Sequence, residues 1–447
     1  MTRHGAKGTA EADEKEGLHA GCLAHLSPES HEQPGLCSIL QVRWNHLHTA
    51  ELQLERSHRD TIMPAPVRRL ATLLLPVMAL FLAGCAATGQ SRYSAVPAPI
   101  AEIASVPGAA RPPIGASEPT PIRFWGDQPL PEGESYGFRA GPDGSFDYLS
   151  LSGGGINGAY GAGFLVGWTQ SGKRPEFEVV TGISVGGIIA PLAFLGPAYD
   201  GQLQAVFATL AGSKTPNLNF IGALLGNSAI ASNSQVLAAI RTIITPETLT
   251  AIGREHVKGR RLLIGTTNLD AQRPVIWDIG AIAVSQIPDR LELVQQVILA
   301  SAALPGVYPP VLIDVRAAGL EFDELHVDGG VTQQIVLLPD GLQSVPRNAN
   351  LYVITNGTIE PTAEPVNVTS LSILERALPT LLKYRGRADL ALLTNQVERA
   401  GVSYQMTEIP PDFPQPRDQW FGGPEWLAAL YQYGVESGLA GVWRRSN

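Results

Sequence analysis

The most constraining feature of this sequence is a short apolar run that ends at a serine between two glycines. Residues 179–183 are β-branched or small, and Gly182 and Gly186 flank Ser184 in a G-x-S-x-G pattern. A pattern of small and apolar residues with helical spacing follows at once. A serine in a sharp turn between a strand and a helix presents its hydroxyl for nucleophilic attack, and the glycines leave room for that turn. The pattern predicts a nucleophile at Ser184, although alone it also fits an ordinary small-residue turn.

A second glycine-rich turn lies shortly before the serine. Residues 146–151 have a strand pattern and residues 159–168 can form a closely packed helix; the turn between them contains Gly153, Gly154, Gly155 and Gly158. Such a turn presents backbone N–H groups to an anion. These groups could form an oxyanion hole for acyl transfer, or, with Glu178 about 20 residues on, a dinucleotide site. A purely structural turn is the third reading, and the nearby serine favours the oxyanion hole.

The candidate base is Asp328, which ends a predicted strand and is followed by Gly329 and Gly330. Few histidines are available as alternatives, because most of them lie before residue 60. His256 stands in a charged run, which predicts a solvated helix face. His326 precedes Asp328 by two positions and would share its face of a regular strand. A Ser–Asp pair and a triad that includes His326 therefore both remain open.

Strand patterns alternate with helical patterns along the rest of the chain. This alternation predicts an α/β fold with a largely parallel sheet. We expect strands at 261–267, 274–278, 311–315 and 351–355, and helices at 246 onward, 291–303, 370–400 (as two helices) and 426–443.

Taken together, these motifs resemble those of the patatin-like phospholipases in order and spacing. The matching segments are Ser152–Gly158, Gly182–Gly186, Gly265–Asp270, Ala300–Pro310 and Asp328–Gly330. The resemblance covers about residues 146–360 and implies a three-layer α/β/α fold with a central, mainly parallel sheet. It also implies a lipid acyl hydrolase without metal or cofactor, in which Ser184 is the nucleophile, Asp328 is the general base, and the N–H groups of Gly153, Gly154 and Gly155 bind the oxyanion. The chain departs from many relatives at Asn157, where they carry arginine.

Residues 63–85 have the features of an export signal. Arg68 and Arg69 precede an apolar run over 70–83, which is shorter than the ~20 residues that a membrane-spanning helix needs. The ending Leu82-Ala83-Gly84-Cys85 resembles a bacterial lipobox, which implies lipidation of Cys85 and a place in the cell envelope, on the periplasmic side of the outer membrane. Residues 1–62 are then interpreted as a non-native extension before a start at Met63.

Residues 86–140 are rich in proline and alanine and are predicted to be a linker, followed by a folded domain over 141–447. A net charge of −9 and 44% hydrophobic residues indicate an acidic globular protein and argue against a nucleic-acid partner. The three cysteines, Cys22, Cys37 and Cys85, form neither a disulfide framework nor a metal-ligand spacing.

The sequence therefore predicts a membrane-tethered serine esterase that acts on phospholipids or related acyl esters. One alternative on the same fold is an acyltransferase that passes the acyl group to an alcohol. Another is a non-catalytic envelope protein, against which the presence of both Ser184 and Asp328 argues.

Overall fold

The computed structural model describes residues 92, 94–109, 121–132, 134–212, 232–338, 345–415 and 423–445. All of them belong to one compact unit, Phe81–Asn447. The expected extension over 1–62, the signal peptide over 63–85 and the lipidation site at Cys85 lie outside the described residues.

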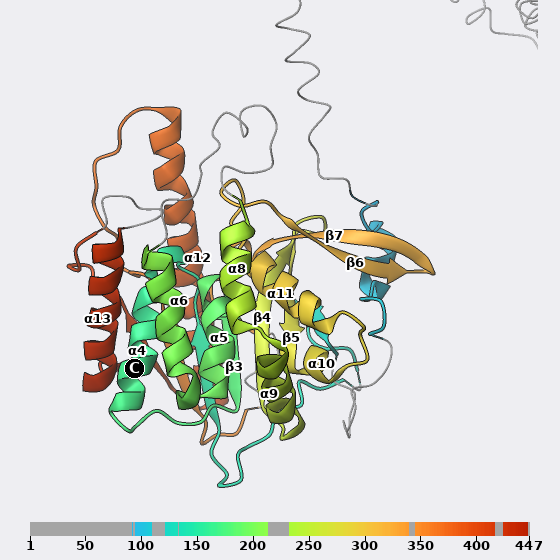
Figure 1. Cartoon of the computed structure of the whole chain (residues 1–447), viewed down its shortest axis with the longest axis horizontal. Coiled ribbons are helices and arrows are strands. Elements are labelled where there is room, and N and C mark those ends of the chain that lie inside the picture. Colours follow the sequence, from blue (N-terminus) through green and yellow to red (C-terminus); the bar gives the residue numbers. More distant parts are fainter. Residues whose placement is uncertain are drawn as a thin grey trace, which may run out of the picture. The chain divides into compact units, whose positions relative to one another are not determined.

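A ten-stranded mixed sheet forms the centre of this unit (Figure 1). Its strand order is β1-β5-β4-β3-β2-β8-β9-β10, and the β6–β7 hairpin joins it through pairing of β7 with β4. The central strands β4, β3, β2, β8 and β9 are parallel to one another, whereas the remaining strands pair antiparallel. The predicted α/β fold with a mainly parallel sheet is confirmed. The strands are β1 (Arg123–Trp125), β2 (Asp147–Leu151), β3 (Val179–Ile183), β4 (Arg261–Asn268), β5 (Arg273–Asp278), β6 (Val311–Ala317), β7 (Leu320–Asp328), β8 (Asn350–Thr355), β9 (Tyr404–Glu408) and β10 (Arg444–Arg445).

Helices connect these strands and cover the sheet. They are α4 (Gly158–Gln170), α5 (Val185–Leu195), α6 (Asp200–Gly212), α8 (Ser234–Ile243), α9 (Pro246–Val257), α10 (Ile279–Val284), α11 (Arg290–Ser301), α12 (Ser370–Ala400) and α13 (Pro424–Ala440), with short 3₁₀ turns η1 (Ala98–Ile103), η2 (Gly155–Asn157), η3 (Pro197–Tyr199) and η4 (Gly329–Val331). Figure 1 shows α13, α4, α6, α5, α8 and α9 on one face of the sheet.

Side chains that alternate along the strands fill a separate core on each face. Leu149 and Leu151 of β2 pack with Phe164 of α4 and the helices around it. The intervening residue Tyr148 belongs to a second core, which includes Leu393 of α12. Helices thus cover both faces of the sheet, as a three-layer arrangement requires.

Part of the expected linker belongs to the folded unit. Residue Ala95 bridges to β7, Ser105 bridges to β6, and β1 adds a strand to β5. Arg92 forms ion pairs with Asp270 and Asp323, at 2.9 and 2.6 Å. The described parts of 86–140 are therefore held by strand pairing and charge, which a composition dominated by proline and alanine does not reveal.

Two helices differ from the expected boundaries. Residues 370–400 form the single helix α12 and not two helices, with Pro379 inside it. Good helix formers on both sides of Pro379 offset the hydrogen bond that the proline cannot donate. The closing helix α13 begins at Pro424 and ends at Ala440, close to the predicted span.

Candidate active site

Ser184 occupies a strained turn between β3 and α5. Its backbone angles are φ 55° and ψ −126°, and it is one of only three residues other than glycine with a positive φ among those described. A serine in this region is held there by its surroundings at a cost of about 1–3 kcal/mol, and such strain concentrates at functional sites. The strand–turn–helix geometry is that of a nucleophile elbow.

The glycines around Ser184 are required by close backbone packing. A Cβ atom on Gly182 would lie 2.4 Å from the carbonyl oxygen of Gly186. One on Gly186 would lie 2.3 Å from the carbonyl oxygen of Leu151, at the end of β2. The G-x-S-x-G pattern therefore lets the elbow press against the neighbouring strand.

Strand β4 brings Asp328 next to this elbow. The last residue of β3, Ile183, pairs with Gly265 of β4, and the next residue of β4, Thr266, pairs with Asp328 at the end of β7. A Cβ atom on Gly329 would lie 2.5 Å from the carbonyl oxygen of Gly265, so the chain can turn here only at a glycine. Asp328 accepts a hydrogen bond at 2.7 Å from the N–H group of Gly330, and the nearby Ser184 hydroxyl lowers its pKa.

Burial changes the acidity of Asp328. Removal from water raises the pKa of this carboxyl to about 6, against the opposing effect of the hydrogen bonds from Ser184 and Gly330. At neutral pH the group is still ionised, yet it is a stronger proton acceptor than an exposed aspartate. This arrangement suits a carboxylate that takes a proton from Ser184.

The glycine loop follows β2 and lies against Ser184. A Cβ atom on Gly153 would be 3.3 Å from that of Ser184, and one on Gly158 would meet the Val185 side chain at 2.2 Å. The N–H group of Gly153 donates to the Gln334 carbonyl at 3.3 Å, so this member of the predicted oxyanion hole is already engaged. Within the described residues, the N–H groups of Gly154 and Gly155 donate no hydrogen bond, so they are available to an oxyanion.

Two buried polar residues at this site, Ser301 and Asn356, were not predicted from the sequence. The Ser301 hydroxyl accepts from the N–H group of Ser184 at 2.9 Å and donates to the Gly265 carbonyl at 2.7 Å, so it ties the elbow to β4. Ser301 stands in the Ala300–Pro310 segment, which matched the family motif without an assigned role. Asn356, after β8, donates from its side-chain amide to the Ser152 carbonyl at 2.8 Å and so fixes the start of the glycine loop.

Gln334 connects the glycine loop and the turn after Asp328 to helix α12. Its side-chain oxygen would be 2.6 Å from a Cβ atom on Gly153, and its side-chain nitrogen 2.4 Å from one on Gly330. Its backbone N–H group donates at 2.6 Å to Asp389 of α12, which is fully buried. Nothing in the sequence around Gln334, six positions after Asp328, indicates that it contacts the glycine loop and α12.

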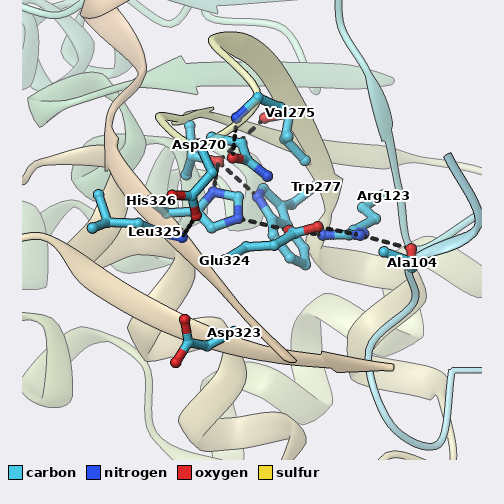
Figure 2. Close-up of polar contacts among 12 residues, drawn as sticks. Ala104, Arg123, Asp270, Val275, Trp277, Asp323, Glu324, Leu325 and His326 are labelled. Carbon is cyan, nitrogen blue, oxygen red and sulfur yellow. Dashed lines mark hydrogen bonds and ion pairs between the residues drawn. The ribbon is translucent and has the colours of Figure 1, made fainter. Parts of the chain in front are cut away.

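His326 lies in a buried network that leads away from Ser184. Trp277 donates from Nε1 to the Thr266 hydroxyl at 2.9 Å, Thr266 contacts His326 Nδ1 at 3.0 Å, and His326 Nε2 contacts Glu324 at 3.1 Å. Figure 2 shows Arg123 beyond Glu324, paired with it and donating to the Ala104 carbonyl. Because both ring nitrogens have partners in this network, the geometry disfavours His326 as the base.

The charges in this network stabilise one another. Burial disfavours ionisation of Glu324, but Arg123 and His326 hold its pKa at about 2. Burial also lowers the pKa of His326 despite the adjacent carboxylate, so the imidazole is neutral at pH 7. The network holds the start of the folded unit against β7, the strand that ends at Asp328.

The structure contradicts two other sequence predictions, the solvated face for His256 and the dinucleotide site with Glu178. His256 is not on a solvated face: it is buried, with Nδ1 3.4 Å from Asp278, because α9 packs it against α10. Glu178 precedes β3 and accepts from the N–H group of Asp147 at 2.6 Å, at the amino end of β2. The glycine loop follows the carboxyl end of β2, so Glu178 cannot reach a dinucleotide bound there.

Within the described part of the chain there is no group of three or more His, Cys, Asp or Glu residues that could hold a metal ion. No single described helix has the length and apolar composition to cross a membrane; by those criteria alone, α8 and α9 would pass together as a pair bent by 59°.

Comparison with known proteins gives a family for the core of the chain. Residues 149–339 match the model of the patatin-like phospholipases, so this segment is similar to that family. The search of curated proteins finds no match. Among solved structures, VipD from Legionella pneumophila is 13% identical with a TM-score of 0.31, over 71% of this chain and 73% of VipD. ExoU from Pseudomonas aeruginosa is 13% identical with a TM-score of 0.26, over 68% of this chain and 55% of ExoU, so the match spans about half of ExoU.

Proposed function

We propose that the patatin-like phospholipase domain of this chain hydrolyses carboxylic esters of lipids, with Ser184 as nucleophile and Asp328 as general base. The observation that carries the proposal is the placement of the buried Asp328, whose pKa is raised to about 6, beside Ser184 at a strained turn. A base with a pKa close to the working pH is ionised and still accepts a proton readily.

The chemistry proceeds in two halves. The Ser184 oxygen attacks the ester carbonyl carbon while its proton passes to Asp328. The tetrahedral oxyanion is stabilised by the N–H groups of Gly154 and Gly155, while Gly153 keeps the loop closed through Gln334. Collapse of this intermediate expels the alcohol, which takes the proton from Asp328 and leaves an acyl group on Ser184.

Water completes the reaction. Asp328 accepts a proton from the water molecule as its oxygen attacks the acyl group. The second tetrahedral intermediate then releases the fatty acid, and the Ser184 oxygen recovers its proton from Asp328. Each proton that Asp328 takes is returned, so one ester and one water give one alcohol and one acid.

The test of this function is a panel of phospholipid classes incubated with the purified chain. We expect fatty acid release from at least one class, and release at the background rate from Ser184→Ala. Equal release by the parent and Ser184→Ala would contradict the proposal. Transfer of the acyl group to an added alcohol in place of water would assign an acyltransferase.

We also propose, from the sequence alone, that Cys85 carries a lipid anchor in the cell envelope. Palmitate labelling in a bacterial host should mark the parent chain and not Cys85→Ser. Labelling that survives this substitution would remove the proposed anchor.

A further inference from the structure

Helix α12 is much longer than the strands that it connects. Its 31 residues span about 46 Å, whereas the six residues of β8 span about 20 Å. The buried residues of α12 all lie towards its end, at Asp389, Leu390, Leu393 and Val397. Among the described side chains of 370–388, none is buried. The first half of α12, residues 370–385, therefore projects beyond the sheet and is called the projecting half.

The projecting half lies at the edge of the sheet that holds the candidate active site. Strands β8 and β9 are parallel, so the helix between them must run back from the carboxyl edge to the amino edge. Ser184 follows the carboxyl end of β3, which is parallel to β2 and β8. In Figure 1, α12 rises above α4 and α13.

The outer surface of the projecting half is apolar. Leu374, Leu381 and Tyr384 expose 63%, 68% and 54% of their surface, and Ile373 exposes 51%. Positions 374, 377, 381, 384 and 388 follow one another at intervals of three and four, so they form one row along the helix. An apolar row of this length on a helix that is also apolar towards the domain indicates a surface that is covered in use.

The opposite side of this helix packs on the loops around Ser184. Gly386 approaches the Gln334 side chain, and Asp389 accepts the Gln334 N–H group at 2.6 Å; both lie on the domain-facing side of α12 and not in the apolar row. The Gln334 carbonyl in turn accepts the N–H group of Gly153. The row itself faces outward, on the half of α12 that starts at the carboxyl edge of the sheet, the edge at which Ser184 lies.

Cations flank the apolar row. The basic side chains in this part of α12 are Arg376, Lys383, Arg385 and Arg387, and the acidic Glu375 and Asp389 adjoin them on the same helix. Three of the four have acidic partners: Arg376 pairs with Glu364, Arg385 with the buried Asp389, and Arg387 with Glu360. Burial and the nearby Arg376 and Arg387 lower the pKa of Lys383, so the cations repel one another. Basic side chains beside an apolar row are the arrangement with which a helix binds the phosphate groups of a bilayer surface.

We infer that the projecting half of α12 docks on a phospholipid bilayer, with Leu374, Leu381 and Tyr384 inserted among the lipids and the basic side chains at the phosphates. Helices that lie in the bilayer interface combine an apolar face with Lys and Arg beside it. The inference rests on the proposed function, because it turns the Ser184 site towards its lipid substrate. A protein bound to the same row would instead stand between the site and the membrane.

The test is co-sedimentation of the full chain with vesicles of phosphatidylcholine and phosphatidylglycerol. Every protein carries Cys85→Ser, so that no acyl anchor contributes. We expect the doubly substituted Leu374→Glu, Leu381→Glu chain to bind vesicles at least about tenfold more weakly than its parent, because two leucine side chains no longer leave water. Its hydrolysis of a soluble short-chain ester should stay within about twofold, which also shows that it is folded.

Matched controls place the same change elsewhere. Leu439→Glu on α13 and Leu320→Glu on β7 alter leucines with 52% and 62% exposure and should leave vesicle binding unchanged. Failure of the parent to bind vesicles, equal loss in the controls, or a parent dimer that the double substitution dissociates would overturn the inference. Ser184→Ala should bind vesicles like the parent; binding without lipid hydrolysis by the parent would contradict the proposed function alone.

Discussion

The Ser184 hydroxyl lies close enough to Asp328 to lower the pKa of its carboxyl, although the two residues come from strands that do not pair with each other. Strand β4 joins them, since Gly265 pairs with the residue before Ser184 and Thr266 pairs with Asp328. A single step along one strand thus sets the relation of Ser184, the proposed nucleophile, to Asp328, the proposed base.

The rate of ester hydrolysis should depend on pH through Asp328. Its pKa of about 6 predicts that kcat/KM falls as the pH drops below about 6, because the protonated carboxyl cannot accept the Ser184 proton. The measurement is a pH profile of kcat/KM with a soluble ester. His326→Gln is the matched control, and its kcat/KM should fall below about pH 6 in the same way. If this fall disappears in His326→Gln, the group that titrates is the imidazole and not Asp328.

Asp328→Asn should stabilise the fold while it abolishes activity. The carboxyl has a pKa of about 6 in the folded chain against 3.8 as its ordinary value, so the folded state binds more protons between these values and loses stability as the pH rises. Above about pH 6 the variant should gain up to about 3 kcal/mol in free energy of unfolding, and below about pH 4 the gain should vanish. Urea denaturation across this range measures it.

Glu324→Gln should behave in the opposite way. The folded pKa of about 2 lies below the ordinary 4.5, so the carboxylate stabilises the fold above about pH 4.5, and that contribution is lost as the pH falls towards 2. At pH 7 we expect the variant to lose about 3 kcal/mol, because Arg123 keeps its charge without a partner. Glu321→Gln, which breaks an exposed pair with Arg316, should cost less than about 1 kcal/mol. Equal losses in the two variants would show that the buried network is not important for stability.

The glycine loop should tolerate a methyl group at one position and not at its neighbour. A Cβ atom on Gly154 would lie 1.8 Å from the Asn356 carbonyl oxygen, whereas one on Gly155 meets nothing within 4 Å. Gly155→Ala has only the cost of a left-handed residue, about 1–2 kcal/mol, because Gly155 has φ 56°. Gly154→Ala should lower the melting temperature far more. Similar melting temperatures for the two variants would contradict the tight packing of this loop on Asn356.

Local patterns predicted the parts of the site that depend on neighbours in sequence. The elbow at Ser184 and the turn after Asp328 were recognisable because a close backbone approach permits only glycine at Gly182, Gly186 and Gly329. The parallel order of strands followed from their alternation with helices.

Features that depend on contacts distant in sequence could not be predicted in this way. The roles of Ser301 and Gln334 arise from the register of β4, β7 and α12, which no short pattern encodes. His256 looked solvated because its sequence neighbours are charged, but α9 turns it towards α10. The segment around Arg92 and Ser105 looked like a linker because its partners, Asp323 and Arg316, lie far along the chain.

The most direct test of the Ser184–Asp328 pair is the rate of covalent labelling by a fluorophosphonate, followed by intact-protein mass spectrometry. The parent chain should gain one adduct at Ser184, and Asp328→Asn should react at least about a hundredfold more slowly, since no base remains to take the serine proton. His326→Gln should label within about tenfold of the parent, a difference of about 1.4 kcal/mol in barrier. A folded His326→Gln chain as unreactive as Ser184→Ala, or an Asp328→Asn chain that labels like the parent, would contradict the account.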